Sequence, residues 1–394
     1  MTGIVYGPVE VNTGEPVLPQ WWGTVDRWTL ACVFLLALIG LVMALAASPA
    51  IAGRNDLDPF YYFYRQAFFA LLALASMVVV SIMSIDLLRR LCILGFVAGT
   101  AALVLLPFLG TDFGKEATRW YSLGFVSFQP SEFAKPFFIV TAAWFLSAKG
   151  VTTTVSGTRI SFFLAMIVIG LLVVQPDFGQ ASLFLAAWML MYFVAGAPVL
   201  ILFCLAVATV LGGVAAFNSS EHFARRIVGF LDRDPDPNSQ AGYVESAIRS
   251  GGNFGVGVGE GKIKWTLPDA HTDYIIAVAA EEYGLMLVLL IVLLFLTITV
   301  SSLVRIRRRR DMFTRIAGTG LTSIFALQGL INMGVAARLL PAKGMTLPFV
   351  SYGGSSILAT AFLVGVLLAF TRARPLRDMD SVLGPMDQAV IRAA

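Results

Sequence analysis

The stretch LPDAHTDYIIAVAAEEYGLMLVLLIVLLFLTITVSSLV, residues 267–304, decides the fold class. Its first residues are polar, and from Asp273 to Val304 it is almost entirely apolar. A helix over 273–304 would be about 48 Å long at 1.5 Å per residue, whereas the hydrocarbon core of a bilayer is about 30 Å thick. We therefore predict a transmembrane helix that tilts or projects, with Asp273 at or just above the membrane surface.

The composition of the whole chain agrees with this interpretation. Of 394 residues, 58% are hydrophobic and 13% are charged, whereas soluble domains carry about 25% charged residues. This predicts an all-α polytopic membrane protein with about ten transmembrane helices and a large extracytoplasmic loop between the seventh and the eighth. The expected spans are residues 28–47, 68–85, 91–109, 132–146, 160–174, 180–195, 198–217, 273–304, 316–336 and 350–370.

Lysine and arginine residues set the predicted orientation. The densest arginine cluster, in residues 305–315, lies between the eighth and ninth expected spans, and cytoplasmic loops carry an excess of such cations. Its place between two spans favours a role in topology over nucleic-acid binding. We expect a cytoplasmic tail at 1–27, a membrane domain at 28–372 that includes the extracytoplasmic loop 218–272, and a cytoplasmic tail at 373–394.

The sequence contains no recognisable metal site. Its three cysteines, Cys32, Cys92 and Cys204, lie in apolar runs, are odd in number and match no metal-ligand spacing. They are typical of small core residues. The run GVGVGEG at 255–261 resembles a phosphate loop only superficially, because no strand and helix flank it. We predict a flexible or close-packed loop there.

Asp273 is the first candidate for chemistry, and two interpretations of it stay open. A carboxylate at a helix N-terminus accepts hydrogen bonds from unpaired amides, so Asp273 is typical of a helix cap. A carboxylate at a partly desolvated interface can also act as a general base toward a substrate hydroxyl. His271, two residues earlier, lies at the same expected helix end.

Charged residues on the expected outer side form a second group of candidates. Arg119 and Lys343 lie in short segments on the expected outer side. Lysine and arginine are usually less frequent in such segments than in cytoplasmic loops. Their position suggests an anionic ligand, with snorkelling to lipid phosphates as the alternative. Glu132 and Lys135 are three residues apart at the start of the fourth span, so they share a helix face and can pair. An anchored loop is the alternative for this region.

Further acids lie in or between the apolar runs. Asp177 lies in the turn QPDFG at 175–179, where it is either an ordinary turn residue or a second acid near the outer surface. Glu281 and Glu282 lie about two turns inside the eighth expected span. Acids at that depth are costly unless they face a cavity or a partner. We therefore expect Glu281 to face one or the other.

Irregular backbone precedes the tenth span. Proline and glycine residues interrupt the run LPAKGMTLPFVSYGGSS at 340–356. Non-helical backbone near membrane depth is tolerated only where it lines a cavity or is buried in protein. Gly353 and Gly354 permit close approach, and Ser355 or Ser356 can bind backbone or substrate. This run is the strongest physical indication of a site.

These motifs, in this order on the expected spans, resemble the SEDS family of peptidoglycan polymerases, from about residue 28 to about residue 372. The motifs that carry the resemblance are RW at 119–120, QPSE at 129–132 with Lys135, QPDFG at 175–179, PDAHTD at 268–273, PAKG at 341–344, LPF at 347–349 and SYGGSS at 351–356. Lys343 and the pair Ile263-Lys264 favour the division branch of the family over the elongation branch. Asp269 stands where the family usually has Glu, and Tyr274 where it usually has Phe; neither change touches the candidate base.

The resemblance implies a peptidoglycan glycosyltransferase that polymerises lipid II outside the cytoplasmic membrane with inversion at the sugar carbon. Asp273 stands at the position of the family's essential acid, so it is expected to be the general base. The residues expected to bind substrate are Arg119, Lys343, His271, Ser351, Gly353, Gly354 and Ser355. The residues expected to shape the site are Glu132, Lys135, Asp177 and Glu281.

The same resemblance implies partners and a location. We expect a multi-pass protein of the bacterial cytoplasmic (inner) membrane that works at the division site in septal cell-wall synthesis. Its expected partners are a class B penicillin-binding protein, which is the septal transpeptidase, and other divisome proteins. The resemblance requires no cofactor and leaves a divalent cation open; no nucleic-acid partner is expected. A lipid II flippase, an elongation-type polymerase and a scaffold for the transpeptidase are the alternatives.

Overall fold

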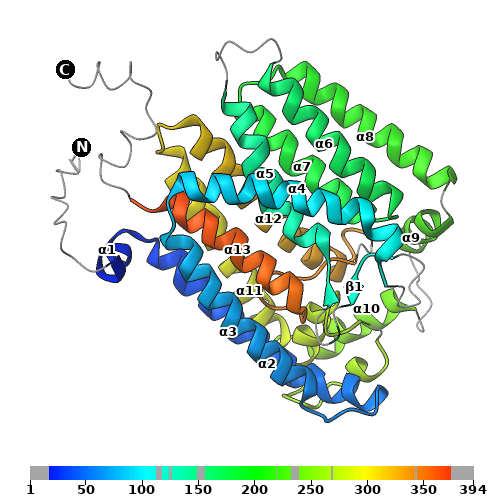
Figure 1. Cartoon of the computed structure of the whole chain (residues 1–394). Helices are drawn as coiled ribbons and strands as arrows, with labels where there is room; N and C mark the ends of the chain where they lie inside the picture. The colour runs from blue at the N-terminus through cyan, green and yellow to red at the C-terminus, as the bar shows by residue number, and fades with distance from the viewer. Residues whose placement is uncertain are drawn as a thin grey trace.

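The computed structural model describes residues 17–111, 118–122, 124, 127–148, 156–219, 221–231, 239–267, 269–341 and 344–373. These residues form a bundle of helices (Figure 1). The helices are α1 Val17–Thr24, α2 Arg27–Arg54, α3 Tyr61–Ile82, α4 Ile85–Leu109, α5 Pro130–Ser147, α6 Gly157–Val174, α7 Phe178–Val194, α8 Val199–Ser219, α9 Glu221–Leu231, α10 Gln240–Gly251, α11 Ile275–Arg307, α12 Met312–Ala336 and α13 Gly354–Thr371. A 3-10 helix, η1, covers Ile263–Trp265, and the short strands β1 Tyr121–Ser122 and β2 Ser127–Phe128 pair antiparallel.

The predicted all-α polytopic fold class is confirmed. Eight of the described helices are long and apolar enough to cross a membrane, namely α2, α3, α4, α6, α8, α11, α12 and α13. α7 is apolar but shorter, and α5 carries Glu132 and Lys135 near its start. Each predicted span overlaps a separate helix, so the apolar runs located these helices, although their ends differ.

α12 and α13 form the inside of the bundle. α13 packs on α3, α5 and α12, and α12 packs on α5, α7 and α11. Apart from Gly354, Leu358 and Phe362, every residue of α13 is buried. By contrast, α8 lies at the edge of the bundle (Figure 1) and has no buried residue. Because its exposed side chains are apolar, lipid is the environment that suits them.

An ion pair at the expected cytoplasmic end joins α2 to α11. Asp26 is fully buried and is the N-cap of α2, where it accepts hydrogen bonds from the N–H groups of Trp28 and Thr29. Its Oδ2 lies 2.8 Å from Nε of Arg305, and its Oδ1 accepts from a second guanidinium nitrogen at 3.0 Å. Ser301 donates to Oδ2 at 2.6 Å. This two-pronged contact fixes the two helices relative to each other.

Inside α11 the structure differs from the prediction. Gly284 has φ +76° and ψ −173°, which is not helical. The N–H of Leu285 donates to the carbonyl of Gly252 at 2.9 Å, a partner outside the helix. The expectation of one continuous, overlong helix is therefore wrong. Residues 285–307, beyond the break, span about 34 Å at 1.5 Å per residue, close to the bilayer thickness of about 30 Å.

The loop that follows α10 satisfies the backbone groups that this break frees. The carbonyl of Glu281 accepts from the N–H of Val256 at 2.9 Å, and that of Glu282 accepts from the N–H of Gly257 at 3.2 Å. A buried carbonyl without a hydrogen-bond donor is costly. The break in α11 is therefore stable only while the loop supplies these donors. The glycine-rich run is thus a close-packed loop, one of the two forms predicted for it.

The carboxylates of the same two acids bind the loop as well. Glu281 Oε1 accepts from the N–H groups of Lys262 and Ile263 at 2.8 and 3.1 Å. Glu282 Oε1 lies 2.5 Å from Nζ of Lys264, and both side chains are buried. Glu281 therefore faces a partner, the loop backbone, as its depth in the span required.

Two stretches predicted as a tail and a loop contain helices. α1 lies within the predicted tail 1–27, and its Trp21 is buried and donates from Nε1 to Ser81 Oγ at 2.8 Å. α9, α10 and η1 lie within the predicted loop 218–272. These elements are shorter than a membrane span, so a search for long apolar runs does not detect them.

We expect Asp26→Ala to lower the free energy of unfolding by about 2–4 kcal/mol, because it removes a helix cap and hydrogen bonds to a charged group. Unfolding of the purified protein in nanodiscs measures the loss. Asp86→Ala is the matched control: Asp86 also pairs with an arginine, Arg89, at 2.8 Å, but this pair is partly exposed and contributes little. Equal losses in the two variants would contradict the role given to Asp26.

Gly284→Ala is expected to cost roughly 1–3 kcal/mol for the backbone conformation alone. A Cβ at this position would also lie 2.4 Å from the carbonyl oxygen of Asn253, so the loop has to move. Limited proteolysis within 239–267 should then become faster. Gly170→Ala in α6, where nothing lies within 4 Å of the added Cβ, is the control. Unchanged proteolysis of Gly284→Ala would show that the loop does not depend on the break.

Candidate active site

Asp273 lies in the turn that leads into α11. The helix begins at Ile275 with Tyr274 as its N-cap residue, so Asp273 lies one residue before the cap position. Backbone bonds close the turn, because the carbonyl of Asp269 accepts from the N–H groups of Thr272 and Asp273 at 3.1 Å each. The turn thus fixes the backbone of Asp273 just before the helix.

The irregular segment before α13 holds this turn in place. Ser351 Oγ donates to the carbonyl of Thr272 at 2.5 Å, and the N–H of Tyr352 donates to the carbonyl of His271 at 2.9 Å. The imidazole of His271 packs against the rings of Tyr62 and Tyr352, with centroid distances of 5.8 and 5.5 Å. Two stretches far apart in the sequence therefore form one unit.

α3 supports the other side of the irregular segment. Gln66 of α3 is 1% exposed; its Nε2 donates to the carbonyl of Ser351 at 3.3 Å, and its Oε1 accepts from the N–H of Gly353 at 3.4 Å. At Gly354, the ring of Phe69 comes within 2.8 Å of where a Cβ would lie. The close approach predicted for the glycine pair is confirmed at Gly354.

A small pocket opens beside Asp273. Its lining residues are Asp273, Tyr274, Ile331, Asn332, Val335, Gly344 and Met345. Gly344 has φ +62°, and a Cβ there would lie 3.6 Å from Asp273 Oδ2, so the pocket wall facing the carboxylate is backbone. Asn332 Nδ2 donates to the carbonyl of Asp273 at 3.0 Å and to that of Met345 at 2.6 Å. The side-chain amide of Asn332 thus binds the backbone of two residues that line the pocket, Asp273 and Met345.

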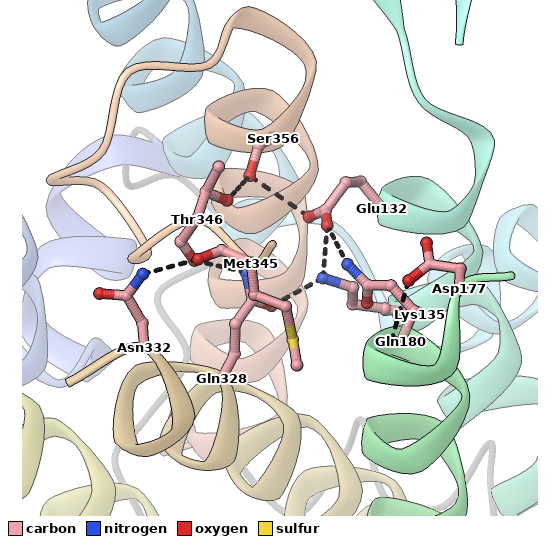
Figure 2. Close-up of polar contacts among 9 residues, drawn as sticks. All are labelled: Glu132, Lys135, Asp177, Gln180, Gln328, Asn332, Met345, Thr346 and Ser356. Atoms are coloured by element: carbon pink, nitrogen blue, oxygen red, sulfur yellow. Dashed lines mark hydrogen bonds and ion pairs between the residues drawn. The ribbon is translucent and has the colours of Figure 1, made fainter. Parts of the chain in front are cut away.

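Close to the irregular segment lies a buried polar network centred on Glu132 (Figure 2). Lys135 Nζ donates to Glu132 Oε1 at 2.8 Å and to Gln328 Oε1 at 2.7 Å. Gln180 Nε2 donates to Glu132 Oε1 at 2.7 Å, and Ser356 Oγ donates to Glu132 Oε2 at 3.3 Å. The predicted pairing of Glu132 with Lys135 is confirmed.

Gln328 connects this network to the irregular segment. Its Nε2 donates to the carbonyl of Thr346 at 3.0 Å, and Thr346 Oγ1 lies 2.6 Å from Ser356 Oγ (Figure 2). The preceding carbonyl, that of Met345, is the one that Asn332 holds. Contacts therefore run without a gap from Glu132 to the backbone of Asp273.

Asp177 and Arg119 adjoin the network at the turn between α6 and α7. Asp177 is the N-cap of α7 and accepts from the N–H of Gln180 at 3.3 Å. Burial raises the pKa of the Asp177 carboxyl, and the charge of Arg119 opposes this. The Arg119 guanidinium donates to the carbonyls of Gln175 and Pro176 at 3.4 and 2.7 Å. Asp177 is thus a structural turn residue that is also joined to the network through Gln180.

The structure gathers most of the predicted site residues into two adjoining groups. The group at the turn contains Asp273, His271, Ser351, Gly353 and Gly354, and the group at the network contains Glu132, Lys135, Asp177 and Arg119. Ser355 is buried, and within the described residues its Oγ has no hydrogen-bond partner. Glu281 lies apart, at the glycine-rich loop. Lys343 falls outside the described residues.

Four functional amides were missed in the sequence. Gln66, Gln180, Gln328 and Asn332 all hold backbone or charged groups of the site. Each lies in a mostly apolar run, which is the signal that could have found it, since polar groups inside a membrane need a partner. Among the described residues, no three His, Cys, Asp or Glu side chains are grouped so that they could hold a metal ion.

The sequence of this chain matches a family model described as "Cell cycle protein", named for FtsW, RodA and SpoVE, over residues 26–375. The chain belongs to this family. It is the family, also called SEDS, that the sequence motifs predicted.

Members of the family with assigned names cover nearly the whole chain. The probable peptidoglycan glycosyltransferase FtsW of Caulobacter vibrioides is 38% identical over 365 residues, which are 92% of this chain and 93% of the relative. The FtsW of Thioalkalivibrio sulfidiphilus is 38% identical over 364 residues, which are 87% of this chain and 88% of the relative. The predicted enzyme class and the likeness to the division branch are confirmed by these relatives.

Solved structures of family members have the same fold. One is a chain from a study of how a peptidoglycan synthase complex coordinates polymerization and crosslinking; its TM-score is 0.73 at 26% identity, over 88% of this chain and 97% of that one. Another is the rod shape determining protein RodA of Thermus thermophilus, with a TM-score of 0.64 at 24% identity, over 89% of this chain and 97% of that one. The second likeness concerns the fold alone.

Lys135→Met is expected to lower the free energy of unfolding by about 3–5 kcal/mol, because it leaves Glu132 as a buried charge without its cation. The double variant Glu132→Gln/Lys135→Met should recover much of this loss, since both charges are gone. Unfolding in nanodiscs measures these two variants and the single variant Glu132→Gln. If the losses of the two single variants simply add in the double variant, the two side chains are not coupled.

Proposed function

We propose that this protein polymerises lipid II into glycan strands at the outer face of the bacterial cytoplasmic membrane, with Asp273 as the general base. The observation that supports this most is the position of Asp273: a turn bound by Ser351 and Asn332 holds it beside a pocket whose facing wall is the backbone of Gly344. A general base must be held within reach of the hydroxyl that it deprotonates. The relatives named as probable peptidoglycan glycosyltransferases support the reaction class.

The proposed reaction joins two disaccharide units. The 4-hydroxyl of the acceptor sugar attacks the anomeric carbon of the donor, which is α-linked to a lipid diphosphate. A carbon–oxygen bond forms to the acceptor while the bond from carbon to the diphosphate oxygen breaks. The hydroxyl proton passes to Asp273, and the electron pair leaves with the diphosphate. Attack from the opposite face turns the α linkage into a β-1,4 linkage.

The departing diphosphate requires positive charge, and we assign this to Lys343 and Arg119. Lys343 directly precedes Gly344, which lines the pocket. Arg119 also binds the carbonyls of Gln175 and Pro176, so it steadies the turn between α6 and α7. A divalent cation could share the charge of the diphosphate. The other residues that we propose to bind substrate are His271, Ser351, Gly353, Gly354 and Ser355.

A septal role and a transpeptidase partner belong to the same proposal. The relatives named FtsW support a function in division. The likeness to a chain from a peptidoglycan synthase complex supports a partner that cross-links strands as they are made, for which a class B penicillin-binding protein is the proposed candidate. The eight described helices able to cross a membrane support a multi-pass membrane protein, and we propose the inner membrane at the division site as its location.

The decisive prediction concerns Asp273→Asn. Wild-type protein with its cognate transpeptidase should polymerise purified lipid II, and Asp273→Asn should lower kcat by roughly 10²–10⁴-fold, the usual contribution of a general base. Separation of the glycan products on gels measures their length and the rate at which they form. Asp269→Asn removes the same charge four residues earlier at a residue with φ +53°, a conformation that Asn tolerates, and is the matched control.

The outcomes separate the alternatives. Equal glycan from wild type and Asp273→Asn would show that Asp273 is not the base. If neither polymerises lipid II while both move it across liposome bilayers, transport is the function. If neither activity is present and the transpeptidase still binds, the protein is a scaffold. Stimulation by an elongation transpeptidase rather than the septal one would assign the protein to elongation.

A further inference from the structure

Asn332 of α12 has an unusual set of contacts beside Asp273. It is 2% exposed, and its Nδ2 donates to two main-chain carbonyls, those of Asp273 at 3.0 Å and Met345 at 2.6 Å. An asparagine amide carries two hydrogens on nitrogen, so both donors are used. Turning the amide over would bring its oxygen against two carbonyl oxygens, so its orientation is determined by these contacts.

The amide oxygen of Asn332 is left without a partner within the described residues. Figure 2 shows this oxygen on the side of the amide that faces away from Met345 and Thr346. A buried acceptor without a donor is rare in native proteins and calls for an explanation. Here the side chain lines the same pocket as Asp273 and Gly344, so a bound molecule can supply the missing donor.

Other buried oxygens without a described partner lie elsewhere. Those of Ser131, Gln180 and Ser355 belong to residues that do not line the pocket at Asp273. Gln328, one turn before Asn332 on α12, holds the neighbouring carbonyl of Thr346 in the same way, but its oxygen accepts from Lys135 at 2.7 Å. Of these two otherwise similar amides, only Asn332 has an acceptor to offer to a ligand.

We infer that Asn332 Oδ1 accepts a hydrogen bond from the sugar bound beside Asp273, either from a hydroxyl or from an acetamido N–H. This inference rests on the proposed polymerase function, because it takes the ligand to be the sugar whose hydroxyl Asp273 deprotonates. The amide fixes the carbonyl of Asp273 on one side and binds the sugar on the other. Asn332 therefore sets the position of the base relative to the sugar, and selects sugars that present a donor there.

The test uses lipid II analogues that each lack one sugar donor other than the attacking hydroxyl. In each, a hydroxyl is replaced by hydrogen, or the acetamido N–H is replaced by N-methyl. For wild type, one analogue should lose about tenfold in kcat/KM, the effect of one neutral hydrogen bond. For Asn332→Leu, the same analogue should lose nothing further relative to lipid II. Asn332→Ser, whose hydroxyl is too short to reach, replaces Asn332→Leu if that variant does not fold.

Gln328→Met is the matched control for a merely structural role. It also releases a carbonyl of the irregular segment, so it should lower activity, but every analogue should still lose the same factor as with wild type. The inference is overturned if the analogue lowers kcat/KM of Asn332→Leu by the same factor as that of wild type. It is also overturned if no analogue lowers kcat/KM of wild type. A wild type that makes no glycan would instead contradict the proposed function. Dissociation constants of the analogues are then measured for Asp273→Asn and for the double variant Asp273→Asn/Asn332→Leu. This comparison tests the contact of Asn332 with the sugar in the absence of turnover.

Discussion

Non-helical backbone inside a membrane domain must find its hydrogen bonds within the protein, and the site depends on this constraint. The segment 344–353 is such backbone. Side chains of two helices satisfy it: Gln66 from α3, and Gln328 and Asn332 from α12. These bonds keep the segment rigid enough to hold the turn that carries Asp273. The carboxylate that we propose as the general base is thus positioned through side-chain amides that bind the surrounding backbone.

The sequence was sufficient for those features that depend on local pattern. Apolar runs located the spans, and a spacing of three residues predicted the contact between Glu132 and Lys135. Irregular composition at 340–356 indicated a site before any contact was known. The contacts of Gln180, Gln328 and Asn332 could not be predicted, because each joins residues far apart in the chain. Such meetings depend on how α5, α7 and α12 pack, and no short window of sequence contains that information.

The break at Gly284 shows why a local pattern can also mislead. The run 273–304 has no proline, so hydropathy alone favours one continuous helix. What interrupts it is the loop at 252–257, which supplies hydrogen bonds to both sides of the break. Two acids that looked costly in a span, Glu281 and Glu282, are the residues that bind this loop. Their burial was readable in the sequence, whereas the identity of their partner was not.

α8 carries a consequence for the response of the molecule to its bilayer. Its 21 residues span about 32 Å at 1.5 Å per residue, and none of them is buried. Hydrophobic matching to the lipid therefore sets its depth and tilt, whereas α12 and α13 are held by their neighbours. In a thinner membrane we expect α8 to tilt more readily than the inner helices, because only partly buried side chains such as Leu202 and Leu205 pack it against the core. We therefore expect a change in membrane thickness to move α8 more than the helices that surround Asp273.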